Sequence, residues 1–100
     1  MKKVAIDIPL DRIAELCRQY QVRELALFGS VLRDDFGTDS DIDFLVEFEP
    51  SAQIGFMTLG RLQAELSELF HRAVDLVPKR GLKPVIRQSV LESAEVVYAA

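Results

Sequence analysis

Two aspartates stand two residues apart in the segment Asp41-Ile42-Asp43, directly after a polar turn. On an extended chain their side chains project from one face, with Cβ atoms roughly 6 to 7 Å apart. Carboxylates this close repel each other unless a cation or a proton lies between them. Oxygen ligands of this kind suit Mg²⁺ or Mn²⁺, which complete their coordination with water and phosphate. The alternative is a pair of solvent-facing acids on a strand, and the pair alone does not decide between the two.

A glycine and a serine, Gly29-Ser30, follow an apolar run and precede a short helical pattern. Glycine allows close approach to the backbone, and the start of a helix offers free N–H groups to an anion. The alternative is a tight turn in which Ser30 is a capping residue. Only ten residues, 31–40, separate this corner from Asp41, so we expect the two to lie side by side. A phosphate-binding corner beside paired carboxylates is suited to a metal–nucleoside triphosphate.

A third acid, Asp75, interrupts the apolar run Ala73-Val74-Asp75-Leu76-Val77. A charge inside a strand that looks buried needs either an ion-pair partner, such as Arg72, or a role in a site. If Asp75 shares a sheet face with Asp41 and Asp43, the three acids converge. Asp75 would then position or deprotonate an attacking hydroxyl while the other two hold metal.

Apolar periodicity predicts the elements that must position these residues. Helices are expected over 9–20, 30–35, 56–71 and 84–94, and strands over 23–28, 41–48 and 73–77. Residues 95–98 are either the end of the last helix or a short fourth strand. In the strand 41–48, even-numbered residues from Ile42 to Phe48 face one way and Asp41, Asp43, Leu45 and Glu47 face the other. Helices interleaved with short strands indicate a small α/β or α+β fold.

Length and composition limit the classes of protein further. The chain has 100 residues, which predicts a single domain over residues 1–100, and 49% of them are hydrophobic. A net charge of −4 argues against direct DNA binding, and no apolar run is long enough to span a membrane. The single cysteine, Cys17, lies on an apolar helix face and excludes an internal disulfide. The N-terminus does not resemble a secretory signal, so we expect a cytoplasmic protein.

Charges are distributed unevenly along the chain. Seven of the sixteen acids lie between Asp34 and Glu49, and five of the twelve bases lie between Arg72 and Arg87. The bases either offset the charge of a bound nucleotide, meet an acidic partner surface, or form a solvated face. The only histidine, His71, is expected at the end of a helix.

The segments Leu27-Phe28-Gly29-Ser30-x-x-Arg33 and Ser40-Asp41-Ile42-Asp43-x-Leu45-Val46 together resemble the minimal nucleotidyltransferases (MNT). These proteins belong to the DNA polymerase beta-like nucleotidyltransferase superfamily. The resemblance extends over nearly the whole chain, because residues 74–77, 82–84 and the C-terminal helix are also similar. It implies a small mixed β-sheet flanked by helices, and transfer of a nucleoside monophosphate to a hydroxyl.

The resemblance also implies roles for single residues. Gly29, Ser30 and Arg33 would bind the triphosphate, although an ion pair of Arg33 with Asp34 or Asp35 is an equal alternative. The three acids, Asp41, Asp43 and Asp75, would be catalytic residues and ligands of two magnesium ions. Manganese is the alternative metal. Asp34 stands where many relatives carry glycine, a difference that would reshape the mouth of the site.

Relatives of this size pair with HEPN-domain ribonuclease toxins as antitoxins, and are similar to enzymes that add AMP from ATP to a tyrosine of that toxin. The resemblance thus implies ATP as substrate and a HEPN toxin as partner in a hetero-oligomer. One alternative is a non-catalytic antitoxin that neutralises the toxin by binding alone, although such an inhibitor gains nothing from clustered acids. Another is a nucleotidyltransferase that acts on a small molecule, for which the chain lacks a visible second domain.

Overall fold

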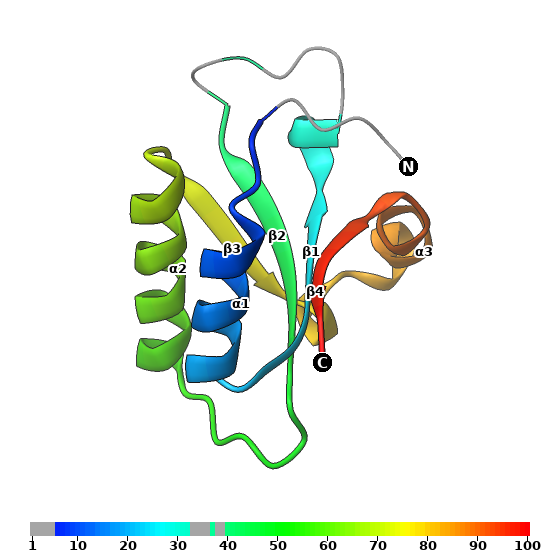
Figure 1. The fold of residues 1–100 in the computed structure, drawn as a ribbon. Coiled ribbons are helices and arrows are strands. Elements are labelled where there is room, and N and C mark those ends of the chain that lie inside the picture. Colours follow the sequence, from blue (N-terminus) through cyan, green and yellow to red (C-terminus); the bar gives the residue numbers. More distant parts are fainter. Residues whose placement is uncertain (1–5, 33–36, 38–39) are drawn as a thin grey trace.

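A computed structural model describes residues 6–32, 37 and 40–100. Its centre is a four-stranded sheet in the order β3-β2-β1-β4. β2 and β3 are parallel, whereas β1 pairs antiparallel with both β2 and β4 (Figure 1). The strands are β1 (Val22–Phe28), β2 (Ile42–Phe48), β3 (Val74–Pro78) and β4 (Glu95–Ala99). The expected fold, a small mixed sheet flanked by helices, is confirmed.

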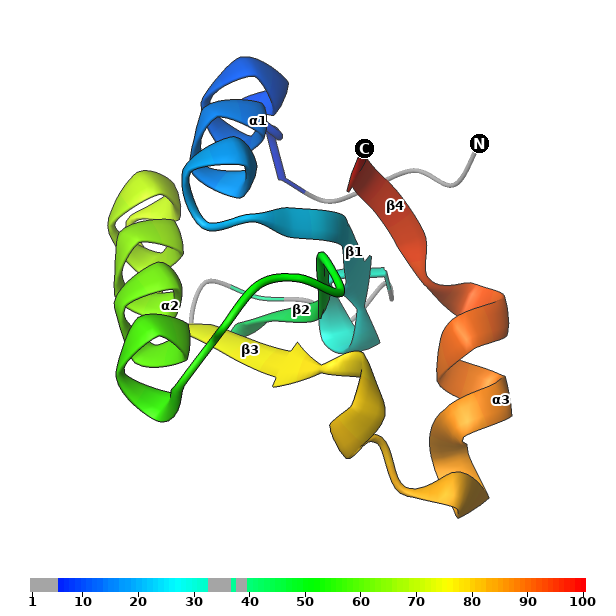
Figure 2. The same ribbon diagram turned by 90° about the horizontal axis from the view of Figure 1, so that it is seen from below.

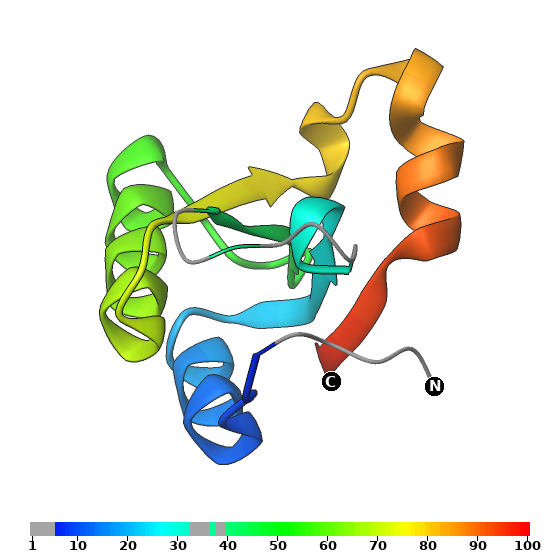
Figure 3. The same cartoon turned by 90° about the horizontal axis from the view of Figure 1, so that it is seen from above.

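Helices cover both faces of this sheet. Two of them, α1 and α2, lie together on one face, and α3 lies on the opposite side (Figures 2 and 3). The α-helices are α1 (Leu10–Gln19), α2 (Phe56–Phe70) and α3 (Pro84–Ser93), and two 3-10 helices are η1 (Gly29–Leu32) and η2 (Lys79–Gly81). The parallel strands β2 and β3 need a long crossover, which α2 supplies.

The main core lies between the sheet and the α1–α2 layer. Ile13 and Cys17 of α1 and Leu62 and Leu66 of α2 pack there against alternate residues of the strands. Burial raises the pKa of the Cys17 thiol to about 12, since a low-dielectric core disfavours the thiolate. A smaller apolar cluster lies under α3 on the opposite face of the sheet. Its buried members are Ala26, Leu45 and Leu82.

Most predicted elements form within one or two residues of the expected bounds. Residues 95–98, which the sequence left open, form the edge strand β4. His71 is the C-cap residue of α2, in the left-handed conformation with φ of 55°. The structure also corrects two of the predicted helices.

The first concerns the predicted helix 30–35. Its described part is η1, which begins at Gly29, so Ser30 lies inside the helix and not at the N-cap position. The second concerns the apolar stripe predicted for α2. Phe56 is 89% exposed and lies outside the core, whereas Leu59 in the same turn packs against it. Among the described residues, none of the helices combines the length and apolar character that crossing a membrane requires.

Candidate active site

Asp43 and Asp75 are direct neighbours across two parallel strands. In the β2–β3 ladder, Asp43 pairs with Asp75 and Ile42 pairs with Val74. The ladder begins at this end, where the Ile42 N–H donates a hydrogen bond of 2.9 Å to the carbonyl oxygen of Ala73. Adjacent strands lie about 4.8 Å apart, so the register brings two carboxylates that are 32 positions apart in sequence next to each other.

Both aspartates project from the α3 side of the sheet. Ile42 and Phe44 on β2, and Val74 and Leu76 on β3, pack into the core on the other side. Because successive side chains on a strand point to opposite faces, the aspartates between these apolar residues point away from that core. Asp75 therefore shares its sheet face with Asp43, as a converging site requires.

The exposure of Asp75 corrects one premise of the prediction. A charge in this apolar run was expected to be buried and to need a partner, but Asp75 is exposed. β3 is an edge strand whose α3 side is open at this point, and an exposed carboxylate remains hydrated without an ion pair.

Asp41 lies just before β2 and is exposed, whereas Asp43 is half-buried. Parity along the chain assigns Asp41 to the same side as Asp43. Within the described residues, no three His, Cys, Asp or Glu side chains come close enough together to hold a metal ion. The backbone thus places the three acids at one corner of the sheet, but their side chains do not form a three-ligand cluster.

Gly29 packs directly against the carboxylate of Asp43. It follows β1, where Phe28 is the register partner of Asp43, and its φ of 75° lies in the left-handed region. A Cβ added to Gly29 would collide with Asp43 Oδ2 and would lie 3.3 Å from its Cγ. Glycine is required here for two reasons, backbone conformation and room for the carboxylate. The expected proximity of the Gly29 corner to the acids is therefore present.

Two of the predicted nucleotide-binding groups cannot be placed. Arg33 lies outside the described residues, as do Asp34 and Asp35, and so does the side chain of Ser30. The backbone of Ser30 belongs to η1, immediately after Gly29. Their predicted contacts with phosphate stay predictions.

Two residues for which the sequence predicted no positioning role hold the strands of the site in place. Arg72 Nη1 donates hydrogen bonds to the carbonyl oxygens of Gly37, at 3.2 Å, and Ser40, at 3.4 Å. Ser40 directly precedes Asp41, so Arg72 ties the approach to β2 to the start of β3. Gln63 Oε1 on α2 accepts a hydrogen bond of 2.9 Å from the N–H of Leu76. This bond satisfies a donor on the edge strand next to Asp75.

The acids present fit a magnesium ion. Mg²⁺ is commonly held by one or two carboxylates together with water and substrate phosphates, so a preformed cage of three protein ligands is not needed. The described corner offers the carboxylates of Asp41, Asp43 and Asp75, and Gly29 leaves room for that of Asp43. Asp41 and Asp43 are the residues that would hold the ion, and Asp75 adjoins them.

Comparison with known proteins points to one family. The model of the family described as nucleotidyltransferase domain matches residues 10–97. The protein adenylyltransferase MntA of Thermococcus cleftensis is 40% identical over 84 residues, which are 84% of this chain and 81% of that protein. A solved structure described as a minimal nucleotidyltransferase is 35% identical, with a TM-score of 0.71 and coverage of 85% of both chains.

A third match is a complex of two proteins. It is the structure of a tri-AMPylated Shewanella oneidensis HEPN toxin with an MNT antitoxin. The matched chain is 24% identical, with a TM-score of 0.66 and coverage of 91% of this chain and 70% of that one. At this identity the likeness concerns the fold alone.

Proposed function

Because this chain belongs to the nucleotidyltransferase domain family, we propose that it transfers AMP from ATP to a tyrosine hydroxyl of a HEPN ribonuclease toxin. In doing so it acts as the antitoxin of that toxin. The name of the Thermococcus relative, a protein adenylyltransferase, supports the transferred group. The Shewanella complex, in which an MNT antitoxin binds an AMPylated HEPN toxin, supports the kind of partner.

The observation that carries the proposal is the pairing of Asp43 with Asp75 across β2 and β3. The two residues come from segments separated by a 15-residue helix, yet they lie at adjacent positions on one face. Gly29 packs on one of them and keeps the backbone of the β1–η1 corner close. Three separate segments thus contribute to a single small surface, which a solvated strand edge does not require.

The chemistry follows from the residue types. The acceptor oxygen attacks the α-phosphorus of ATP, the bond from that phosphorus to the bridging oxygen breaks, and pyrophosphate leaves. Asp75 accepts the proton of the attacking hydroxyl and orients it. Asp41 and Asp43 would hold magnesium, which when bound neutralises phosphate charge during transfer. The corner at Gly29 and Ser30 presents backbone to the triphosphate, and Arg33 adds a positive charge.

The test uses purified chain, ATP labelled at the α-phosphate, Mg²⁺, and a purified HEPN-domain toxin. Label should appear on the toxin and should be lost when EDTA is added. The double variant Asp41→Ala/Asp43→Ala should lose the label while its circular dichroism spectrum is unchanged. A matched double variant, Asp11→Ala/Glu15→Ala, removes two exposed acids from α1 and should label normally.

Two results would contradict the assignment. Full labelling by the Asp41→Ala/Asp43→Ala variant would show that these acids are not the catalytic ones. Neutralisation of the toxin in cells by the same variant would favour an antitoxin that acts by binding alone.

A further inference from the structure

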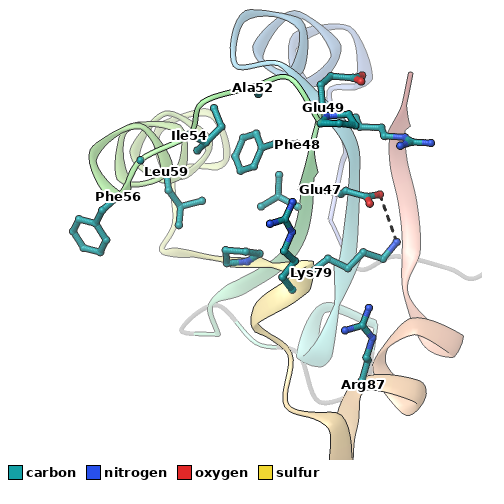
Figure 4. Close-up of a pocket in the computed structure, with 15 residues that line it drawn as sticks. Glu47, Phe48, Glu49, Ala52, Ile54, Phe56, Leu59, Lys79 and Arg87 are labelled. Carbon is teal, nitrogen blue, oxygen red and sulfur yellow. Dashed lines mark ion pairs between the residues drawn. The ribbon is translucent and has the colours of Figure 1, made fainter.

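A groove of about 410 Å³ lies at the end of β2 and β3 that is remote from the acids (Figure 4). Its walls come from the ends of these strands, the start of β1, the loop before α2, the first turns of α2, η2 and one residue of α3. Val46, its nearest lining residue on β2, follows Asp43 by three residues. At ~3.3 Å per residue the groove begins roughly 10 Å from that aspartate along the strand. We call it the β2–β3 groove, and it is separate from the candidate active site.

One side of the β2–β3 groove is apolar. Phe48, Ile54 and Leu59 gather there (Figure 4). Phe56, at the start of α2, also lines the groove and is 89% exposed, and the adjacent Met57 is 78% exposed. Adjacent large apolar side chains that remain exposed next to a concave surface are typical of protein–protein contacts.

The other side of the groove is basic. Four bases line it, Arg23, Lys79, Arg80 and Arg87, against two acids, Glu47 and Glu49. Lys79 is engaged within the chain, since its Nζ lies 3.0 Å from Glu24 Oε1 and 3.9 Å from Glu47 Oε1. Arg80 and Arg87 are exposed. The whole chain carries a net charge of −4, so this local excess of bases is opposite in sign to the rest of the molecule.

We propose that the β2–β3 groove docks an acidic segment of the protein acceptor, and this inference rests on the function proposed above. An apolar side chain of that segment contacts Ile54 and Leu59, and its carboxylates pair with Arg80 and Arg87. A bound nucleotide would also use the arginines. It would leave the apolar surface of Phe56 and Met57 unexplained, whereas a protein segment covers both.

The position of the groove gives the docking a purpose. An anchor that begins roughly 10 Å away raises the local concentration of the acceptor hydroxyl without occupying the site of ATP. Charge pairs at the rim of the contact steer the encounter and speed association.

The experiment measures binding of the HEPN toxin to the full chain by calorimetry without nucleotide, and then the KM values for toxin and for ATP. Arg80→Glu/Arg87→Glu should raise the Kd for the toxin about tenfold or more, because both charges then repel the partner. Phe56→Ser should raise it about fivefold or more. The matched controls are Arg12→Glu/Arg18→Glu, exposed bases on α1, and Val85→Ser, which is 87% exposed on α3 and outside the groove.

The controls should bind within about twofold of the parent chain, and the KM for ATP should be unchanged in every variant. Unchanged toxin binding by the groove variants would overturn the docking proposal. A raised KM for ATP without a raised Kd for the toxin would also overturn it. Absence of toxin binding by the parent chain would also overturn it. If the parent chain binds the toxin through the groove but does not label it, the proposed function fails and the docking site stands.

Discussion

Asp43 on β2 and Asp75 on β3 are register partners in a parallel ladder and face the side of the sheet opposite the main core. The first stands at the beginning of β2 after a polar approach, and the second interrupts an apolar edge strand. Their meeting depends on α2, which returns the chain so that β3 starts beside the start of β2. Any change that shifts β3 by one residue would turn Asp75 to the other face.

Replacing Gly29 with alanine should damage both the site and the fold. A non-glycine residue in the left-handed region costs about 1–2 kcal/mol, and the added Cβ collides with the Asp43 carboxylate. We expect a lower free energy of unfolding in urea and loss of most AMP transfer. Gly60→Ala is the matched control, since nothing lies within 4 Å of its added Cβ and alanine favours the helix by about 1 kcal/mol. Equal stability of the two variants would contradict the contact.

Two phenylalanines should respond very differently to truncation. Phe44 is fully buried and its ring centroid lies 5.7 Å from that of Phe70, so Phe44→Ala should cost about 3–5 kcal/mol. Phe56 is 89% exposed, so Phe56→Ala should change the free energy of unfolding by less than about 0.5 kcal/mol. Chemical denaturation measures both. A large loss for Phe56→Ala would show that the start of α2 packs against a core.

Stability should fall at alkaline pH because of Cys17. Burial raises the pKa of its thiol from 9.0 to about 12, so the folded chain keeps the proton that the unfolded chain releases. The contribution is full below pH 9 and is lost as pH rises from 9 toward 12. The difference in unfolding free energy between the parent chain and Cys17→Ala should therefore shrink over this range. A difference that stays constant from pH 7.5 to 10.5 would contradict the buried, protonated thiol.

Arg72→Lys should slow AMP transfer with little loss of stability. A lysine has one ammonium group on a flexible chain and cannot reproduce the planar guanidinium that contacts the carbonyls of both Gly37 and Ser40. The approach to Asp41 would then be less well fixed, which should lower kcat more than it raises the KM for ATP. Steady-state kinetics separates the two. An unchanged kcat would show that these hydrogen bonds do not position the acid.

Local pattern predicted most of the fold. The alternation of β2 correctly separated Ile42 and Phe44 from Asp43, and the resemblance to the minimal nucleotidyltransferases is confirmed by the comparisons. Whether residues 95–98 form a strand or the end of a helix depends on their pairing with β1, which no local pattern reveals. Phe56 has the right spacing for the α2 stripe, but spacing does not show where the opposing surface ends.

The candidate site was predictable in residue type more than in arrangement. Asp75 was identified as an unusual charge in an apolar run, for the wrong reason, because β3 is an edge strand that is buried on one face and exposed on the face of Asp75. The contact of Gly29 with Asp43 depends on φ and on register, which require coordinates. The β2–β3 groove is lined by residues as far apart in the sequence as Arg23 and Arg87. Apart from the cluster of bases, no sequence pattern predicted it.

The most direct test of the paired acids is the rate of AMP transfer by Asp75→Asn under single-turnover conditions with saturating ATP and Mg²⁺. Asparagine keeps the shape of the side chain but cannot accept the proton of the acceptor hydroxyl. The control for loss of one exposed charge is Glu92→Gln on α3. We expect the rate to fall about 100-fold or more for Asp75→Asn and to stay unchanged for Glu92→Gln. A rate equal to that of the control would contradict this prediction.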